Sequence, residues 1–287
     1  MPELPEVETV RIQLARAVIG KTIDRVEVFH AKIVAHDETI EDRLTGKTIE
    51  NIDRIGKLMI FSFVGEKDLF LLAHLKMTGQ FFFVEQGEVS GGGHSMTEAD
   101  VAELPGRHTR VAYYFTDGSV LYFNDMRLFG YTKLADAGEV AIARAGFGPE
   151  PIDAEFDTEW FVSAVRKKTA LIKAVLLDQK FVAGLGNIYV DEALWRAEVR
   201  PTRRANKLTK AEAAAIAAAS GDVMRESIAV GGTTFQHFVD TGGHNGNFTD
   251  YLNVFGKQGT ACSRCGTIIK KIRAAGRGTH FCPGCQK

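Results

Sequence analysis

Pro2 and Glu3 place a candidate nucleophile beside a candidate acid at the start of the sequence. We expect Met1 to be removed, because the residue that follows it is small, so that Pro2 carries a free secondary amine. A secondary amine that adds to a sugar C1′ or an aldehyde gives a cationic iminium directly, and an α-amine titrates closer to neutral pH than a lysine. The adjacent carboxyl group is placed to donate a proton. This pair predicts covalent catalysis.

The same segment also has the pattern of an ordinary helix start. Val7, Val10 and Leu14 follow Pro5 on one helical face, and Gly20 provides a stop. An amine that precedes such a helix meets the positive potential of its N-terminus, which disfavours the ammonium form. Taken alone, these residues leave both interpretations open, a purely structural helix and a catalytic amine.

All four cysteines of the chain lie in its last 26 residues, in two Cys-x2-Cys pairs. The pairs are Cys262 with Cys265 and Cys282 with Cys285. In a chain for which we expect no export signal, this spacing indicates a tetrathiolate Zn2+ site rather than disulfides. A closed site of this kind folds a short segment and takes no part in chemistry, so we expect one structural zinc.

Positive charge is concentrated at the C-terminus, although the net charge of the whole chain is −1. Residues 257–287 contain seven Lys or Arg and no Asp or Glu, and smaller basic runs lie at 166–173 and 200–207. One such run is usually a solvated surface, but three runs beside a metal motif favour binding to a polyanion. The basic residues between the two cysteine pairs are Lys270, Lys271, Arg273 and Arg277.

Length and composition indicate a globular protein of two domains, with 287 residues, 45% hydrophobic and 25% charged. No stretch approaches the ~20 apolar residues that a membrane span needs, and the N-terminus lacks a basic segment followed by an apolar run. We therefore expect a cytoplasmic, nucleoid-associated monomer without a membrane partner.

Short segments of β-strand pattern fill the first part of the chain, and Asp117-Gly118 is a two-residue hairpin signal. Closely spaced strands of this kind indicate an antiparallel β-sandwich. Residues 86–106, which contain three consecutive glycines, are expected to form a long loop without structure of its own. The expected strands are 22–29, 48–55, 57–64, 68–76, 81–85, 110–115 and 119–124.

Helical periodicity replaces the strand pattern from about residue 156. Residues 134–155 contain glycines and prolines typical of a linker, and the glycine-rich residues 232–250 predict a flexible stretch. The fold class expected is α+β with two domains. The expected helices are 156–166, 168–178, 188–197 and 210–231. The expected segments are an N-terminal domain (1–133), the linker (134–155), a helical domain (156–256) and a zinc finger (257–287).

Several single residues could carry chemistry, yet each also has a common structural explanation. The turn at 184–187 opens onto a helix as a phosphate-binding turn does, but glycine-rich turns often only connect helices. Lys57 taken alone is a surface lysine, and His74 fits a core histidine equally well. Arg127 and Phe129 follow a strand end, where an arginine commonly forms a surface ion pair and a phenylalanine commonly packs in the core.

Together, these segments resemble the bacterial formamidopyrimidine-DNA glycosylases over nearly the whole chain. The sister group that removes oxidised pyrimidines has a similar layout but typically begins PEGPE, so Leu4 favours the purine-lesion branch. The matching segments are PELPEVETV (2–10), GK (56–57), HLKMTG (74–79), RHTR (107–110), DMRLFG (125–130), KKTALIK (167–173), LLDQKFVAGLGNIYVDEALW (176–195), GGTT (231–234) and GRGTHFCPGCQ (276–286).

The resemblance implies an N-terminal antiparallel β-sandwich with flanking helices and a C-terminal helix–two-turn–helix domain with a four-cysteine zinc finger. It implies damaged double-stranded DNA as the partner, and excision of oxidised purines, chiefly 8-oxoguanine and formamidopyrimidines. Because a base inside the stack is out of reach, the nucleotide must be flipped out. In the implied reaction, Pro2 attacks C1′, Glu3 supplies a proton, and β,δ-elimination then cuts the strand.

The resemblance also distributes roles over matched positions. An aromatic wedge with an arginine offsets the stacking lost when a base is flipped, and residues 232–250 correspond to a loop that closes over the lesion. The catalytic residues implied are Pro2, Glu3, Glu6, Lys57 and Arg277. The DNA-binding residues implied are His74, Met77, His108, Arg127, Phe129, Lys168 and Asn187.

Departures from the family pattern and two alternative functions accompany the resemblance. Leu128 stands where the family usually has Lys or Arg, Lys76 stands where it often has Gly, and Ala229-Val230 precede GGTT where a more polar pair is common. One alternative is a non-catalytic zinc-containing DNA-binding protein, for which the Pro2 amine would have no use. The other is a related glycosylase for oxidised pyrimidines, against which Leu4 speaks.

Overall fold

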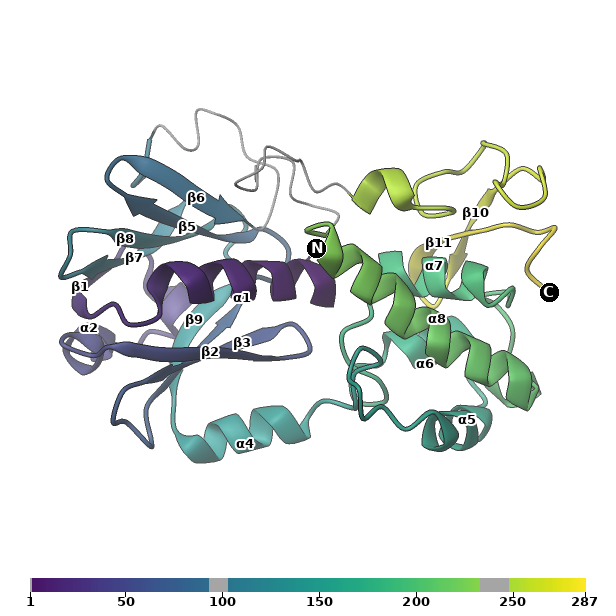
Figure 1. The fold of residues 1–287 in the computed structure, drawn as a ribbon, viewed down its shortest axis with the longest axis horizontal. Helices are drawn as coiled ribbons and strands as arrows, with labels where there is room; N and C mark the ends of the chain where they lie inside the picture. Colours follow the sequence, from purple (N-terminus) through teal and green to yellow (C-terminus); the bar gives the residue numbers. More distant parts are fainter. Residues whose placement is uncertain (1, 93–102, 233–247) are drawn as a thin grey trace. The chain divides into compact units, whose positions relative to one another are not determined.

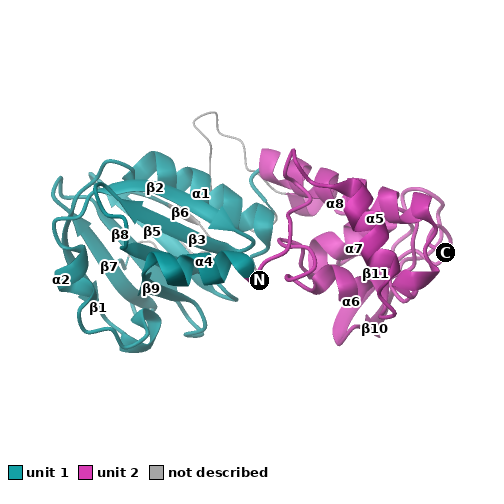
Figure 2. Ribbon diagram, turned by 90° about the horizontal axis from the view of Figure 1, so that it is seen from below, with its two compact units in different colours: residues 1–145, 230–247 teal, residues 146–229, 248–287 magenta. Residues whose placement is uncertain are grey.

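The computed structural model describes residues 2–92, 103–232 and 248–287, and the chain forms two compact units (Figure 1, Figure 2). Unit 1 comprises residues 1–145 and 230–247, and unit 2 comprises residues 146–229 and 248–287. Within the described ranges, no helix is both long enough and apolar enough to cross a membrane.

Unit 1 contains two antiparallel sheets, one with the order β1-β7-β8-β5-β6 and one with the order β2-β3-β4-β9. Their inward side chains and one face of helix α1 (Leu4–Val18) form a common apolar core, as the alternating sequence pattern predicts. The fold class is thus confirmed for this part. The strands are β1 (Ile23–Val28), β2 (Ile49–Ile55), β3 (Leu58–Phe63), β4 (Phe70–His74), β5 (Gly79–Glu85), β6 (Glu88–Gly92), β7 (Thr109–Phe115), β8 (Val120–Asp125) and β9 (Tyr131–Ala135).

The prediction of an unstructured loop over 86–106 is wrong at its start. Strand β6 lies within this range and pairs with β5, with Glu85 opposite Glu88. Gln86 and Gly87 both have positive φ, as a two-residue hairpin turn of this kind requires. Strand β6 lies at the edge of its sheet, so its sequence can be polar and lack the apolar alternation that indicates a strand. Residues 93–102 lie outside the described residues.

Short helices and one further strand were also absent from the sequence expectations. Strand β9 pairs with β4, with His74 opposite Tyr131, and so completes the second sheet. Helix α4 falls in the range expected to be a linker. The additional helical segments of unit 1 are η1 (Ala31–Val34), α2 (Ile40–Leu44) and α4 (Ala137–Ala145).

Unit 2 is helical, with a two-stranded hairpin near its C-terminus. Gly221 lets α8 approach the chain closely, since a Cβ there would lie 2.5 Å from the carbonyl oxygen of Pro151. The predicted helix over 168–178 is too long: Leu171 instead bridges to Arg204 before α6 begins. The elements are α5 (Thr158–Arg166), α6 (Ile172–Leu177), α7 (Asn187–Arg196), η2 (Ala205–Lys207), α8 (Lys210–Ala229), η3 (Phe248–Tyr251), β10 (Lys270–Ala274) and β11 (Arg277–Phe281).

Candidate functional site

The N-terminal end of α1 presents Pro2 and Glu3, both of which are buried. Glu3 is the N-cap residue and forms a capping box with Glu6, whose carboxylate accepts the Glu3 backbone N–H at 2.8 Å. Gly232, with φ +82°, approaches the same place, since a Cβ there would lie 3.2 Å from the Glu6 side chain. The backbone at the candidate nucleophile is therefore held in one position. Residues 233–247, the rest of the predicted flexible stretch apart from 248–250, lie outside the described residues.

Lys57 is not the surface lysine that its type alone suggests, since it is only 7% exposed. It follows Gly56, which has φ +57°, in the turn between β2 and β3. Arg54 fixes this turn by donating to the carbonyl oxygen of Gly56 at 2.8 Å and to Glu8 at 2.8 Å. Glu8 belongs to α1, so the Arg54–Glu8 ion pair joins this turn to the helix that begins after Pro2.

The loop after β8 exposes the predicted wedge. Phe129 is 50% exposed, and the guanidinium carbon of Arg127 lies 4.7 Å from the centre of its ring. Asp125, which is fully buried, shapes the loop: its carboxylate accepts backbone N–H groups of Arg127 (3.1 Å), Phe129 (2.8 Å) and Gly130 (2.7 Å). Phe129 is thus held out of the core by backbone hydrogen bonds, contrary to the core position that its type suggests.

A second turn, which carries Met77, is joined to this loop. The hydroxyl of Thr78 donates to Asp125 and accepts the backbone N–H of Arg127 at 3.1 Å. Sequence reasoning missed Asp125, because a carboxylate at the end of a strand has no distinctive pattern. Both turns therefore depend on one buried side chain, and Met77, Arg127 and Phe129 belong to one assembly.

His74 lies at the end of β4 and is half-buried. Burial, with smaller contributions from the charges of Lys76 and Lys57, lowers the pKa of His74 to about 3. Its Nδ1 accepts the backbone N–H of Lys76 at 3.0 Å, which places the proton of the neutral ring on Nε2. The imidazole is therefore uncharged at neutral pH and stabilises the turn that carries Met77.

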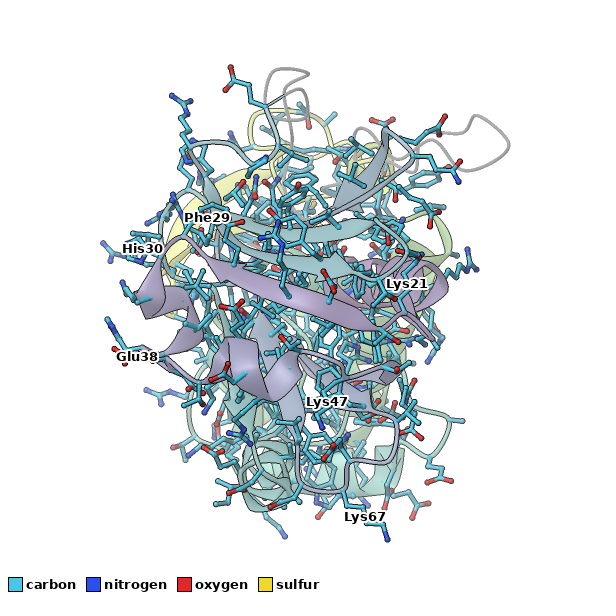
Figure 3. The ribbon with its side chains drawn as sticks, turned by 90° about the vertical axis from the view of Figure 1, so that its left-hand side faces the viewer. Lys21, Phe29, His30, Glu38, Lys47 and Lys67 are labelled. Carbon is cyan, nitrogen blue, oxygen red and sulfur yellow. The ribbon has the colours of Figure 1, made fainter. Side chains whose placement is uncertain are left out.

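Two of the lysines labelled at the β1 end of unit 1, Lys21 and Lys47, are paired with carboxylates (Figure 3). Lys21 forms ion pairs with Glu85 and Asp117, and Lys47 pairs with Glu66 at 2.5 Å. Asp117 accepts hydrogen bonds from Lys21 and Ser119, which lower its pKa to about 2. This end of unit 1 is thus a mixed-charge surface, unlike the basic hairpin of unit 2.

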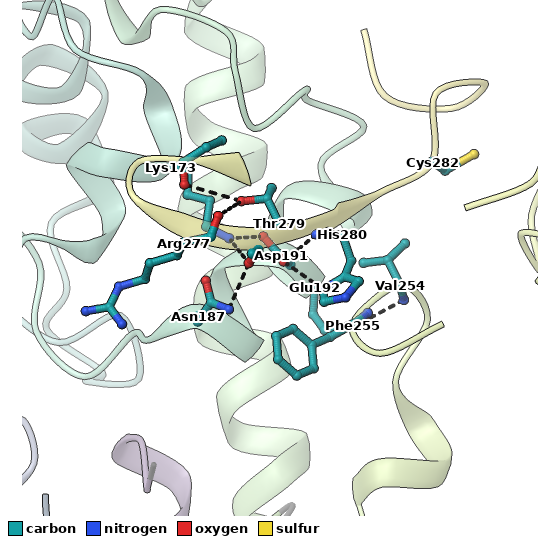
Figure 4. A network of polar contacts seen from close by, with 12 residues as sticks. Lys173, Asn187, Asp191, Glu192, Val254, Phe255, Arg277, Thr279, His280 and Cys282 are labelled. Atoms are coloured by element: carbon teal, nitrogen blue, oxygen red, sulfur yellow. Dashed lines mark hydrogen bonds and ion pairs between the residues drawn. The ribbon is translucent and has the colours of Figure 1, made fainter. Parts of the chain in front are cut away.

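Unit 2 carries the other predicted contacts. Asn187 is the first residue of α7, and its Nδ2 donates to the carbonyl oxygen of Gly278 at 3.0 Å (Figure 4). Arg277 begins β11 and is exposed. Lys168 is also exposed, with its Nζ 5.4 Å from the centre of the Phe181 ring. His108, in unit 1, is half-buried and accepts the Asp125 N–H through its carbonyl oxygen at 2.9 Å.

The four cysteine sulfurs lie within 4.8 Å of one another. The sulfurs of Cys262 and Cys285 are 3.8 Å apart, and those of Cys265 and Cys282 are 3.5 Å apart. A tetrahedral zinc with bonds of about 2.3 Å needs sulfur atoms about 3.8 Å apart. The donor set therefore fits one structural Zn2+, as the spacing predicts.

The surroundings of the sulfurs also favour a bound cation. Burial and the neighbouring thiols raise the pKa of Cys285 to about 12, whereas hydrogen bonding to Thr267 lowers that of Cys265 to about 6. Four thiolates cannot coexist at such a site unless a cation compensates their charge. The indole N–H of Trp195 donates to the sulfur of Cys262 at 3.4 Å, which orients this ligand.

Comparison with known proteins gives consistent matches along the chain. The family model of the formamidopyrimidine-DNA glycosylase N-terminal domain matches residues 1–132, that of its H2TH domain matches 147–239, and a zinc finger found in FPG and IleRS matches 259–287. A formamidopyrimidine-DNA glycosylase from Lactiplantibacillus plantarum is 42% identical over 99% of this chain and 98% of its own length.

Solved structures agree with these matches. The Lactococcus lactis Fpg in complex with DNA that contains an abasic site is 36% identical, with a TM-score of 0.85 and full coverage of both chains. A structure of MutM in complex with DNA that contains carbocyclic 8-oxo-G is 37% identical, with a TM-score of 0.84 and the same coverage.

Proposed function

The chain belongs to the formamidopyrimidine-DNA glycosylase family, and from this premise we propose how its residues excise an oxidised purine and cut the strand. The substrate proposed is 8-oxoguanine or a formamidopyrimidine in duplex DNA, and the reaction combines glycosylase and AP lyase steps. The observation that carries the proposal is the position of Pro2 and the buried Glu3 at the N-terminal end of α1. We expect this DNA target to bring the protein to the nucleoid.

In the first step, the lone pair of the Pro2 nitrogen forms a bond to C1′ as the bond from C1′ to the base breaks. Glu3 donates the proton that opens the sugar ring or leaves with the base. The Pro2 nitrogen then loses its proton and the C1′–O4′ bond breaks, with O4′ taking a proton, so that the product is a ring-opened iminium on Pro2. Glu6 supports this step by accepting the Glu3 N–H, which fixes the N-cap residue.

In the second step, the iminium draws electrons from C2′, so that a proton leaves C2′ and the C3′–O bond breaks. A further elimination breaks the bond to the 5′ phosphate, which opens the strand on both sides of the lesion. We assign assistance in these eliminations to Lys57 and Arg277. The fixed position of Lys57 supports its part, since Arg54 ties the turn that carries it to the helix that begins after Pro2.

The remaining side chains hold DNA in this proposal. Met77, Arg127 and Phe129 enter the gap that the flipped base leaves, and the exposed ring of Phe129 supports this role. His74, His108, Lys168, Asn187 and the basic residues of β10 and β11 contact the backbone or the wedge turn. The zinc centre holds the hairpin and supplies no chemistry.

Borohydride trapping tests the proposal. We expect a duplex with 8-oxoguanine opposite cytosine to give a covalent adduct, and peptide mapping to place it on Pro2. Pro2→Gly should retain DNA binding but lose most trapping, whereas Pro5→Ala, a change to the next proline along the chain, should leave trapping intact. An adduct on a lysine would contradict the assignment of the nucleophile.

A lesion panel separates the alternatives. Faster excision of oxidised pyrimidines than of 8-oxoguanine would contradict the proposed substrate class. Binding to an abasic-site duplex without any trapped adduct would favour the non-catalytic alternative. Trapping by Pro2 on the abasic duplex alone would retain the lyase and contradict the glycosylase step for 8-oxoguanine.

A further inference from the structure

An ion pair that is completely withdrawn from solvent joins two helices of unit 2. The Nζ of Lys173, on α6, lies 2.6 Å from Oδ1 of Asp191, on α7, and both side chains are 0% exposed (Figure 4). Neither residue has a part in the reaction derived above. Buried charges need hydrogen-bonding partners in place of water, so the groups around this pair indicate its role.

Both members of the pair reach the hairpin that carries Arg277. The second carboxylate oxygen of Asp191 accepts the backbone N–H of His280 at 2.8 Å. The Nζ of Lys173 donates to the carbonyl oxygen of Gly278 at 3.3 Å. Two alternate residues of β11 are thus held by side chains of α6 and α7 (Figure 4).

A third contact links this arrangement to the start of α7. The carbonyl oxygen of Gly278 also accepts Nδ2 of Asn187 at 3.0 Å. Gly278 is adjacent to Arg277, whose side chain extends away from the network (Figure 4). The position of Arg277 relative to Asn187 therefore depends on how Gly278 is held.

Stability alone does not account for a pair of this kind. Removal of two charges from water costs several kcal/mol each, and apolar residues of similar volume often stabilise a core as well or better. The zinc centre already attaches the hairpin at Cys282, one end of the strand. What the pair adds is a directional attachment at 278 and 280, next to Arg277.

We propose that the buried Lys173–Asp191 pair is a positioning device that fixes β11 on α6 and α7 and so sets the position of Arg277 relative to Asn187. The pair touches no substrate and acts through Gly278 and His280. This inference rests on the proposed role of Arg277, and its test is designed to distinguish the two.

The test is a double-mutant cycle on the full-length, zinc-loaded protein. Lys173→Met removes the cation and leaves Gly278 with one attachment fewer. We expect it to lower the single-turnover rate of strand cleavage, at saturating DNA, by about 100-fold, the effect of a displacement near 1 Å. In an Arg277→Ala background, the same change should alter the rate by no more than about twofold. An equal loss in both backgrounds would overturn the proposal, because general destabilisation acts regardless of Arg277.

Hydrogen exchange supplies the readout that does not depend on activity. We expect Lys173→Met to accelerate exchange of the His280 amide while the zinc content stays at one per chain; unchanged exchange would overturn the attachment. Full activity of Arg277→Ala together with accelerated exchange would instead refute the proposed role of Arg277. If Lys173→Met loses zinc, Asp191→Asn, which preserves side-chain shape, takes its place in both measurements. Arg196→Met is the matched control, since it removes the surface ion pair with Glu226 from the same helix α7.

Discussion

Asp125→Ala is the substitution that the structure singles out in unit 1. The carboxylate of Asp125 is fully buried and accepts hydrogen bonds from three backbone N–H groups and from the hydroxyl of Thr78. All four donors lie in the two turns that carry the wedge residues. The Asp125 side chain is enclosed by protein, so the substitution acts through the two turns. We expect the substitution to unfold the wedge locally and to weaken unit 1 as a whole.

The expected loss in free energy of unfolding depends on whether each N–H donor can bond to water in the variant. A hydrogen bond to a charged group contributes about 1.5–3 kcal/mol. Arg127 and Phe129 are exposed, so their amides regain water in the variant, whereas Gly130 is buried and leaves an unsatisfied donor. With one or two bonds counted in full, the free energy of unfolding of unit 1 should fall by about 1.5–6 kcal/mol.

Urea denaturation with two probes measures this effect. The chain has two tryptophans, Trp160 and Trp195, and both belong to unit 2, so their fluorescence reports that unit alone. Far-UV circular dichroism in the β-sheet region reports unit 1. We expect the sheet transition of Asp125→Ala to move to lower urea while the fluorescence transition stays in place.

A matched variant and an activity assay complete the test. Asp117→Ala removes a half-exposed carboxylate from the turn between the same strands β7 and β8, and it should shift the sheet transition less. Excision of 8-oxoguanine should fall with Asp125→Ala because the wedge is no longer held. A sheet transition equal to that of the unaltered protein would refute the reasoning.

Three further predictions concern protonation, metal and charge. Because the pKa of His74 is lowered to about 3, the unfolded chain binds a proton between pH 6.5 and about 3 that the folded chain does not bind. The free energy of unfolding should therefore fall as the pH is lowered through this window, by up to about 1.4 kcal/mol per pH unit. His74→Asn, which retains an acceptor for Lys76, should flatten that slope in urea titrations at several pH values. Cys282→Ser should release zinc, measured with a chromogenic chelator, and weaken DNA binding while the sheet signal of unit 1 is unchanged; unaltered affinity would show that the finger does not contact DNA. DNA affinity should fall steeply with salt, and Lys271→Ala should reduce the slope of log affinity against log salt by about one if that lysine neutralises a phosphate; an unchanged slope would exclude this contact.

The sequence predicts the elements whose side chains alternate or recur regularly, and it misses those held by their neighbours. Helix α1 and the strand pairs β2–β3 and β7–β8 follow from apolar periodicity, and the structure confirms them. Strand β6 has a polar, glycine-rich sequence and exists because β5 offers it a partner. A pairing between strands is a property of the sheet, so no local pattern in 86–92 reveals it.

The candidate site likewise contains residues whose placement the sequence predicts and residues whose placement it misses. Cysteine spacing alone predicts the zinc ligands, because the metal requires that spacing. By contrast, the turn that carries the buried Lys57 is held by an arginine on the preceding strand, and the loop that exposes Phe129 is held by the carboxylate of Asp125. These placements depend on buried polar partners, which a single sequence does not distinguish from surface charges.

Lys76 shows how a departure from the family pattern gains a physical meaning. It stands where the family often has glycine, and its φ is +51°, a left-handed conformation that glycine adopts without steric cost. The hydrogen bond from its backbone N–H to His74 holds this conformation in place. Leu128, another departure, has φ +57° and lies among the residues whose amides Asp125 binds. Each wedge turn therefore combines a left-handed backbone residue with a side-chain acceptor that binds its amides, so substitution of His74 or Asp125 should release strain and displace the wedge residues.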